Sequence, residues 1–364
     1  MPIEAKTALL ISGLATFFII GSGMAIFGPA LPVYEREFHI TTATSGLLVS
    51  TLWVGCLGGV AAMYLKGAKI TPRMGLALLA LGSVLLAVAP LWSVALAGAL
   101  IFGLGYGIVA ALFNPRVLVA FAGSGATKLS MLNAVFSLGA ILAPYGFTLM
   151  GGDLRPVFWA MAAISALIWA PSGPIARTGL PPASVARGFR LHLPILGLAV
   201  LAIGIEASLA GLGPTALIRA GVGEDTAANL LSLFFVAALV TRIALILTAH
   251  RFPDFSIFIA ATAFATLTAL GAALISPAFF FPMMGVSAGL FFQGEYVTAT
   301  RKMGDDPRVS PIILGVGLIG AILSPLAYAR LMDMADPHGF FWLVAGVAGA
   351  ATLAGLASYR SMMR

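Results

Sequence analysis

The chain has 364 residues, of which 60% are hydrophobic and only 9% are charged, and its formal net charge is +7. Soluble globular domains carry roughly 25% charged residues, so composition excludes a soluble enzyme, a disordered chain and a nucleic-acid-binding protein. The single cysteine, Cys56, lies in an apolar run, which excludes an intrachain disulfide and a cysteine-based metal site. The composition therefore indicates an integral membrane protein.

Interruptions in hydrophobicity divide the chain into apolar stretches, and a helix needs about 20 apolar residues to cross a bilayer. We expect an all-α integral membrane protein with twelve transmembrane helices and no soluble domain. The predicted spans cover residues 7–33, 42–64, 74–90, 92–114, 129–150, 155–171, 193–215, 226–248, 255–275, 277–300, 309–331 and 338–358.

Basic residues are unevenly divided between the two sides that twelve alternating helices define. Four of them, Arg36, Arg155, Arg219 and Arg330, fall on one side, and the other 16 of the 20 Lys and Arg residues fall on the side that carries both termini. Cytoplasmic loops are enriched in Lys and Arg, so we expect both termini in the cytoplasm. We expect a multi-pass protein of the cell inner (plasma) membrane that contacts lipid and is a monomer.

The two halves of the predicted array repeat each other. Gly28-Pro29 ends the first span and Gly213-Pro214 ends the seventh, an offset of 185 residues. The run from Gly139 to Pro144 in the fifth span matches the run from Gly320 to Pro325 in the eleventh, an offset of 181. Both offsets are close to half of the chain, so we expect two pseudo-symmetric bundles of six helices. The expected parts are an N-terminal bundle over 1–172, a cytoplasmic linker over 173–192 and a C-terminal bundle over 193–364.

Two six-helix halves with a basic linker resemble the major facilitator superfamily of secondary transporters over the whole chain. Local motifs are similar to those of its fucose-type sugar:proton symporters. These motifs are Leu31-Pro32 to Phe38 at the end of span one, Asn114-Pro115 after span four, Gly204 to Arg219 in span seven and Phe234-Phe235 to Arg242 in span eight. The resemblance implies that a small solute moves across the membrane by alternating access, and it makes protons the candidate coupling ion.

The chain departs from these symporters at the acids associated with proton coupling. In the symporters an aspartate lies four residues before the proline of the Leu-Pro pair, and a glutamate lies four residues before Asn-Pro; this chain has Gly28 and Ala110 there. The loop between spans two and three usually reads Gly-x-x-x-Asp-Arg-x-Gly, and here Pro72 replaces its aspartate. The sugar specificity and the proton route of the symporters therefore do not carry over.

Three charged side chains lie well inside the predicted spans: Glu206, Arg242 and Glu295. A charge costs roughly 2.5–3.5 kcal/mol at a helix centre on the insertion scale, so each marks a candidate functional site. We expect Glu206 ~20 Å from the cytoplasmic start of span seven, near the midplane, where transporters of this architecture bind substrate. Glu206 is therefore the candidate proton-coupling residue and a candidate substrate ligand; a hydrogen-bonded structural carboxyl is the alternative.

Arg242 and Glu295 are both expected ~8–9 Å from the cytoplasmic ends of their helices. Their matched depth predicts an ion pair that holds the inner ends of the second half together or acts as a gate. Direct binding of an anionic substrate by Arg242 is the alternative.

Uncharged polar and aromatic side chains complete the candidate substrate site. Amides fix the orientation of a ligand and aromatic rings fill space, so the set suits a small neutral polar or amphipathic solute. With Glu206, the candidate substrate-binding residues are Asn114, Asn133, Gln293, Tyr106, Trp53 and Phe136.

Several sequence motifs are absent, and their absence separates the remaining functional classes. The sequence has no phosphate-binding loop, no clustered histidines and no nucleophile–base pair at depth, so we expect no cofactor, no metal, no nucleic-acid partner and no enzyme activity. The prediction is a secondary transporter; a non-transporting membrane receptor or assembly factor built on the same fold is the alternative.

Overall fold

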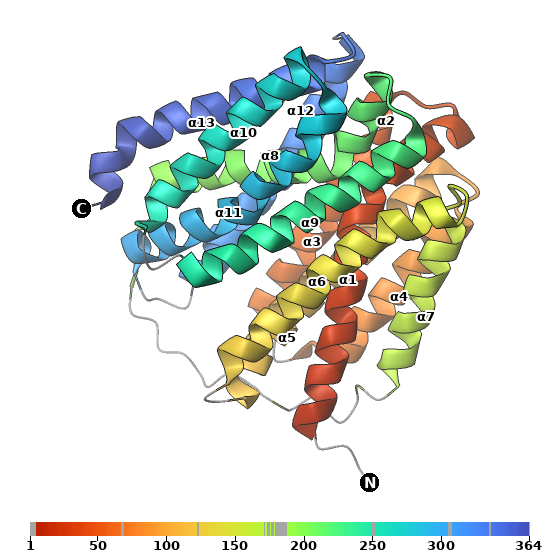
Figure 1. Cartoon of the computed structure of the whole chain (residues 1–364). Helices are drawn as coiled ribbons and strands as arrows, with labels where there is room; N and C mark the ends of the chain where they lie inside the picture. The colour runs from red at the N-terminus through yellow and green to blue at the C-terminus, as the bar shows by residue number, and fades with distance from the viewer. Residues whose placement is uncertain are drawn as a thin grey trace. The chain divides into compact units, whose positions relative to one another are not determined.

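A computed structural model describes residues 5–66, 69–121, 124–170, 172, 175, 178, 188–248, 252–304, 308–334 and 336–363, without the side chains of residues 125, 126, 246–248 and 293. These residues are almost all helical, and none of them lies in a strand (Figure 1). In chain order the helices are α1 (Ala5–Phe38), α2 (Thr42–Ser45), α3 (Leu47–Lys66), α4 (Pro72–Val88), α5 (Trp92–Ala120), α6 (Gly125–Leu149), α7 (Arg155–Trp169), α8 (Leu193–Arg219), α9 (Glu224–Thr248), α10 (Asp254–Leu274), α11 (Pro277–Met303), α12 (Val309–Met334) and α13 (Gly339–Met363).

Helices occupy all of the ranges that hydrophobicity predicts, and α2 and α3 together fill the second range. Among the described residues, nine stretches are long and apolar enough to cross a membrane, while α4 and α7 are shorter apolar helices. Helices suit a bilayer because they satisfy their own backbone hydrogen bonds where no water is present. The all-α part of the prediction is confirmed.

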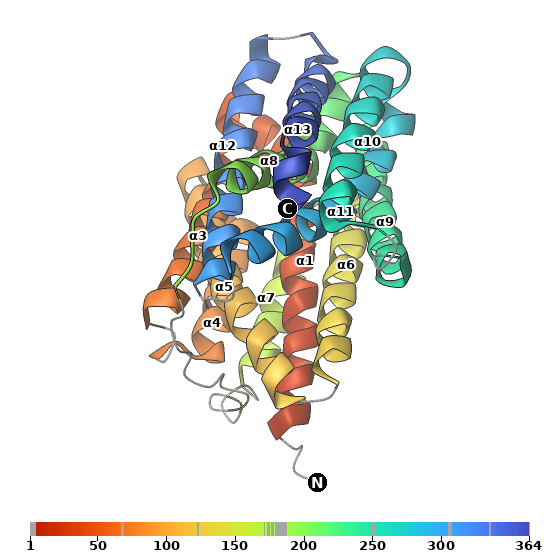
Figure 2. The same ribbon diagram turned by 90° about the vertical axis from the view of Figure 1, so that its left-hand side faces the viewer.

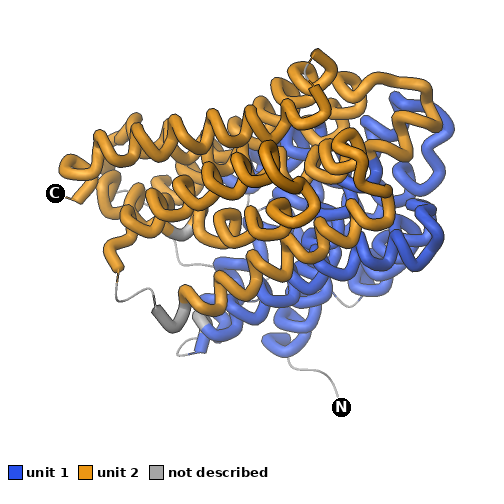
Figure 3. Tube along the Cα trace, turned by 45° about the horizontal axis from the view of Figure 1, so that its top comes forward, with its two compact units in different colours: residues 1–30, 51–184 blue, residues 31–50, 185–364 orange. Residues whose placement is uncertain are grey.

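The chain divides into two compact units (Figure 3). Unit 1 comprises Met1–Ala30 and Thr51–Ser184, and unit 2 comprises Leu31–Ser50 and Val185–Arg364. The helix α1 therefore contributes its first part to unit 1 and its last part to unit 2. The short helix α2 belongs to unit 2, together with α8 to α13.

Glycines bring the helices of unit 1 into backbone contact. Gly103 on α5 faces the carbonyl oxygen of Leu52 on α3 so closely that a Cβ atom would overlap it. Gly139 on α6 faces the carbonyl oxygen of Phe18 on α1 in the same way. Lipid supplies no hydrophobic drive between helices, so such close approaches contribute through dispersion and good packing.

Unit 2 uses the same type of contact. Gly285 on α11 faces the carbonyl oxygen of Phe234 on α9, and Gly320 on α12 faces the carbonyl oxygen of Val200 on α8. In both cases a Cβ atom would overlap the facing backbone. The glycines of the repeated motif are therefore packing residues.

The glycine contacts of the two units are related by one sequence offset. Residues 103 and 52 of the α3–α5 contact become residues 285 and 234 of the α9–α11 contact when 182 is added to each, and 182 is half of 364. The α1–α6 contact follows to within one residue, because 18 becomes 200 and 139 becomes 321, next to Gly320. Equivalent pairs of helices thus pack through equivalent positions, which is the structural form of the internal repeat.

The core of unit 2 is built around α8. This helix contacts α9, α11, α12 and α13, and 78% of its most apolar 18-residue stretch is buried. On another side of the unit, α10 and α13 pack side by side, as Figure 2 shows. A helix that is surrounded in this way holds its central residues away from lipid.

Candidate functional site

Glu206 occupies the middle of the most enclosed helix of unit 2. The helix α8 runs from Leu193 to Arg219, so 206 minus 193 and 219 minus 206 both give 13 residues on either side. At 1.5 Å per residue, the carboxyl-bearing turn lies ~20 Å from each end. The residue is buried, with 9% of its surface exposed. The sequence placed an acid at the centre of a span, and the structure has it at the centre of α8.

Arg242 on α9 is the partner of Glu206. Its Nη2 lies 3.5 Å from Oε1 of Glu206, and 33% of the arginine side chain is exposed against 12% of the glutamate side chain. The distance is at the outer limit of a hydrogen bond, so the two charges attract each other without a tight directional bond. The carboxylate is enclosed, whereas the guanidinium reaches a more open space. Because the contact is weak, Glu206 and Arg242 can separate and bind other partners at a small cost in free energy.

The structure shows a different partner for Arg242 from the predicted Glu295. Arg242 pairs with Glu206 instead, although α9 and α11 do pack against each other. The reason lies in the direction around the helix. Gly285 and Gly289 of α11 face α9. At 100° per residue, Glu295 lies roughly 80–120° away from that line. Equal predicted depths of two residues do not determine on which side of its helix each residue lies.

Glu295 is enclosed, and the described residues provide no ion pair to it. Only 1% of the residue is exposed, and its Oε1 has no hydrogen-bond partner among the described residues. Its neighbour on the next position, Tyr296, donates a 2.8 Å hydrogen bond to Oγ of Ser310 on α12. Glu295 is therefore a buried acid whose environment differs from that of Glu206.

Trp53 and Tyr106 form an aromatic pair in unit 1. Their ring centroids are 5.8 Å apart at an interplanar angle of 49°, and each residue is 8% exposed. The pair lies at the α3–α5 contact because Gly103 brings these two helices together. Two of the predicted site residues are thus brought together, and they supply an apolar surface with a polar edge.

The predicted amide residues have different environments. Asn114, which precedes Pro115 on α5, has a buried Oδ1 without a hydrogen-bond partner among the described residues. Asn133 on α6 is exposed, and its Nδ2 donates to the carbonyl of Leu129 at 3.1 Å. Asn114 therefore has a free acceptor, whereas the Asn133 amide bonds to its own helix.

Two predicted residues contribute differently. Phe136 on α6 is half-buried, and its backbone carbonyl packs against Gly21 of α1. Gln293 lies on α11, but its side chain is outside the described part of the chain. The predicted residues belong to both units: Trp53, Tyr106, Asn114, Asn133 and Phe136 to unit 1, and Glu206, Arg242, Gln293 and Glu295 to unit 2.

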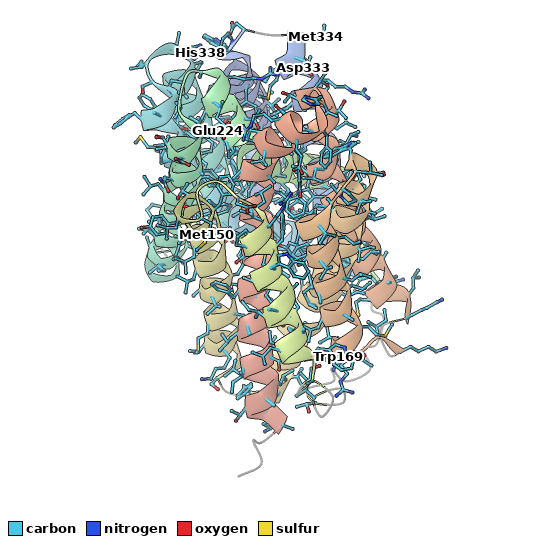
Figure 4. All side chains as sticks on the ribbon, turned by 90° about the vertical axis from the view of Figure 1, so that its right-hand side faces the viewer. Met150, Trp169, Glu224, Asp333, Met334 and His338 are labelled. Carbon is cyan, nitrogen blue, oxygen red and sulfur yellow. The ribbon has the colours of Figure 1, made fainter. Side chains whose placement is uncertain are left out.

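A polar network at one end of unit 2 was not predicted from the sequence. Arg219, the last residue of α8, donates from Nη2 to Oδ1 of Asp333 at 2.5 Å and to Oγ1 of Thr42 at 2.7 Å, and from Nη1 to the carbonyl of Met332. Oδ2 of Asp333 accepts from the backbone N–H of Ala43 at 2.8 Å. Figure 4 shows Asp333 at this end of the unit. The network ties the start of α2 to the ends of α8 and α12.

Two further polar contacts join the end of α1 to the same unit. Arg36 forms an ion pair with Glu224 at the start of α9, and both side chains are exposed. Oε1 of Glu35 accepts a 2.6 Å hydrogen bond from Oγ of Ser45 on α2. The sequence signal for this network is a charged residue at the end of each helix, Arg36 on α1 and Arg219 on α8.

Part of the chain is similar in sequence to a curated transporter. No family model matches the chain. An uncharacterised MFS-type transporter of Yersinia pestis is 30% identical over 164 residues, which cover 42% of this chain and 41% of the relative. The match thus spans less than half the length of that relative.

Solved transporters share the fold along nearly the whole chain. The nucleoside transporter NupG superposes with a TM-score of 0.74 at 15% identity, covering 100% of both chains. The E. coli fucose:proton symporter FucP superposes with a TM-score of 0.66 at 17% identity, covering 97% of this chain and 98% of FucP. The chain has the fold of membrane transporters of the major facilitator type. The fold that the sequence resemblance to that superfamily implies is confirmed.

Proposed function

We propose that this protein is a secondary active transporter that moves a small polar or amphipathic solute by alternating access. One observation carries the proposal within the transporter fold: a buried acid, Glu206, is paired with Arg242 at the centre of α8. Charges at this depth are expensive in a bilayer, and a purely structural role does not need them. We assign proton coupling to Glu206.

The weak contact between Glu206 and Arg242 gives a physical route to coupling. Protonation of Glu206 removes its charge, so Arg242 loses the partner that it holds at 3.5 Å. The free energies of two conformations that differ in this contact then change by different amounts, and their populations shift. Arg242, which is one-third exposed, becomes available to a solute in the transport path. A proton on Glu206 and a solute near Arg242 would thus favour the same state.

The solute class is inferred from uncharged groups. The Trp53–Tyr106 pair offers an aromatic surface, and Oδ1 of Asn114 offers an acceptor without a partner in the described chain. A ligand with hydroxyl or amine donors and an apolar face suits such groups. The solutes in the names of the structural neighbours, a nucleoside and fucose, have these properties. We propose that Asn133, Gln293 and Phe136 contribute further contacts.

The proposed organisation follows from the repeat of helix contacts. We propose twelve spans in two six-helix halves, residues 1–172 and 193–364, with a cytoplasmic linker over 173–192. The offset of 182 between equivalent glycine contacts supports a duplicated bundle. Both termini are proposed to be cytoplasmic in an inner membrane, and the protein is proposed to act as a monomer without enzyme activity.

Transport assays in proteoliposomes test this function. Uptake of D-xylose, fucose and uridine is measured with and without an imposed pH gradient, first to find a transported solute. For that solute, Glu206→Gln keeps the shape of the side chain but cannot titrate, so uphill accumulation should disappear while counterflow exchange continues. Unchanged accumulation by a well-folded variant would reject Glu206 as the coupling residue. Absence of uptake and of solute-dependent thermal stabilisation across solute classes would favour the receptor alternative.

A further inference from the structure

The acid on α11 is not used by the proposed function and is enclosed more completely than Glu206. Glu295 is 1% exposed, and its Oε1 has no hydrogen-bond partner among the described residues. An ionised carboxylate in such a place loses its hydration and gains no counter-charge. Glu206, in contrast, has Arg242 at 3.5 Å. The contacts therefore match a state in which Glu206 is ionised and Glu295 carries a proton.

The register of α8 and α11 fixes the relative depth of the two acids. At one end, the backbone N–H of Arg190, just before α8, donates to the carbonyl of Met303 at 3.3 Å. At the other end, the ring of Phe281 lies against Gly213. The residue numbers add up to 493 at the first contact and to 494 at the second, so the helices run antiparallel with a constant register.

This register separates the two acids by a short distance along the helices. The position level with Glu206 on α11 is residue 287 or 288, because the paired numbers add up to 493 or 494. Glu295 lies seven or eight residues further along α11. At 1.5 Å per residue the axial separation is about 11 Å, with Glu295 nearer to the end of α11. Direct contact over such a gap is impossible, so proton exchange between the two acids requires bridging water molecules.

Helical rotation brings both acids near the line of contact between α8 and α11. Glu206 is seven residues from Gly213 on α8, which is a rotation of about 20°. Glu295 is 14 residues from Phe281 on α11, a rotation of about 40°. Since Phe281 contacts Gly213, the two acids follow the same seam between α8 and α11. By the same rotation, the small side chains of Ala199 and Ala202 are expected on this side of α8 between the two levels.

We propose that Glu295 is a second proton-binding carboxyl, which exchanges its proton with Glu206 through water along the α8–α11 seam. In the transfer, protonated Glu206 loses a proton to water while carboxylate Glu295 gains one, so charge and proton number are conserved. The Glu206 carboxylate then regains Arg242 as its partner. The exchange with Glu206 rests on the proposed function, whereas proton binding at Glu295 does not.

Other titratable groups also lie around α11. The helices packed against α11 are α8, α9, α10 and α12. In the half of α11 that ends at Met303, Arg301 lies 3.9 Å from Asp254 of α10, and Lys302 donates to the carbonyl of Ser361 on α13 at 2.7 Å. Among the described residues, further titratable groups on or next to these helix halves are Arg190, His192, Glu206, Arg242, Tyr296 and Arg308. In the described residues, none of them forms an ion pair or hydrogen bond with Glu295.

Infrared difference spectroscopy tests proton binding at Glu295 without any solute. Purified protein in lipid nanodiscs is titrated with acid and base, and the carboxylic-acid C=O stretch is recorded in H2O and D2O. We expect a band at neutral pH that is lost in Glu295→Gln and retained in Glu206→Gln and in the exposed control Glu37→Gln. A band of unchanged intensity in a folded Glu295→Gln variant, or no protonated band in the wild type, would overturn the proposal.

Two further measurements keep the result interpretable. Glu295→Asp retains a titrating group, so it should keep a shifted band even if the glutamine variant folds poorly. Loss of the band in Glu295→Asp would contradict the proposal.

For the exchange itself, the rate of proton uptake after a pH jump is followed with a pH-sensitive dye in proteoliposomes. Slower uptake by Glu206 in the Glu295→Gln variant supports the path, and an unchanged rate rejects it. Failure of Glu206→Gln to alter transport would reject the proposed coupling residue but leave the infrared result intact.

Discussion

The two units pack their helices in the same way but carry charge differently. Equivalent helix contacts are related by an offset of 182 residues, as in the α3–α5 and α9–α11 pairs. The charged residues inside unit 2 do not follow this repeat. At the same offset, the counterparts of Glu206, Arg242 and Glu295 in unit 1 are Met24, Val60 and Phe113.

Charges in unit 1 lie near helix ends in the part of the chain that the structure describes. Arg73 at the start of α4 donates to the carbonyl of Ala170 at 2.8 Å, and Arg116 near the end of α5 donates to the carbonyl of Ile175 at 3.3 Å. Both groups bond to backbone. The helix packing of a duplicated fold can therefore be the same in both halves while the charged residues differ. Both units have the glycine contacts between helices, and only unit 2 has charged side chains in the middle of its described helices.

The largest effect should come from the glycines that both units share. Gly103→Leu and Gly285→Leu each push a side chain into a facing backbone carbonyl, which cannot move unless two helices separate. We expect each change to lower the free energy of unfolding by about 3 kcal/mol. Thermal unfolding in detergent measures it, with Gly146→Leu, whose Cβ position has no neighbour within 4 Å, as the control. Harmless replacement at only one of the two sites would break the equivalence of the units.

The glycine repeat also shows how far the sequence could predict the fold. The positions of the helices and the Gly139–Gly320 match follow from hydrophobicity and local pattern. The Gly28-Pro29 and Gly213-Pro214 pairs, however, are offset by 185 and lie three residues out of the packing register. A short motif can recur near an equivalent position without being equivalent, and only the contacts distinguish the two cases.

The sequence identifies the charged residues of the candidate site but not their pairing. Composition identifies Glu206, Arg242 and Glu295, because charges are rare in apolar helices. Which of the two acids faces Arg242 depends on how α8, α9 and α11 are rotated about their axes. The network of Arg219 and Asp333 depends on which helix ends meet, and this is decided by tertiary packing.

A second substitution tests whether unit 1 tolerates a charged side chain in the middle of a helix. Met24→Glu puts a carboxyl at the counterpart of Glu206, where Val60 occupies the position equivalent to Arg242. Without a cation, we expect a loss of stability of about 2.5–3.5 kcal/mol. Folded yield and unfolding temperature are compared with those of Met24→Gln, which is polar but uncharged. Equal stability of the two variants would show that unit 1 tolerates a deep charge.

The polar network at the end of unit 2 should contribute less. Asp333→Ala leaves Arg219 without its carboxylate and the N–H of Ala43 without its acceptor, and both side chains of the ion pair are less than one-third exposed. We expect a loss of about 2 kcal/mol in chemical unfolding. Arg36→Ala removes the exposed pair with Glu224 and should cost under about 1 kcal/mol. Similar losses for both variants would mean that the network is no stronger than a surface pair.

The pairing inside unit 2 can be measured by a double-mutant cycle. We expect Glu206→Gln and Arg242→Gln to couple by about 1 kcal/mol, because the two side chains are in contact. For Glu295→Gln and Arg242→Gln we expect additivity within about 0.5 kcal/mol. Thermal unfolding of the single and double variants gives both coupling energies. Stronger coupling through Glu295 would reverse the pairing in the structure.

The smallest expected effect concerns a cation over an aromatic ring at the end of unit 1. The guanidinium carbon of Arg73 lies 4.8 Å from the centroid of the Trp169 ring, and Arg73 also donates to the backbone carbonyls of Trp169 and Ala170. Trp169→Leu removes the ring and keeps both carbonyls, so the change isolates the ring contact. Trp169 is 43% exposed, and we expect a loss of about 0.5 kcal/mol.

Unit 2 offers a matched control for this contact. Arg308 lies 4.9 Å from the centroid of the Phe189 ring, so Phe189→Leu makes the same kind of change there. A tryptophan face attracts a cation more strongly than a phenylalanine face, so Trp169→Leu should lower the unfolding temperature slightly more. Raising the salt concentration should reduce both effects because the cations are near solvent. A loss above about 2 kcal/mol for Trp169→Leu would mean that the ring mainly packs against α4 and α7, and unit 1 would then owe the stability of this end to apolar burial, as it does at its centre.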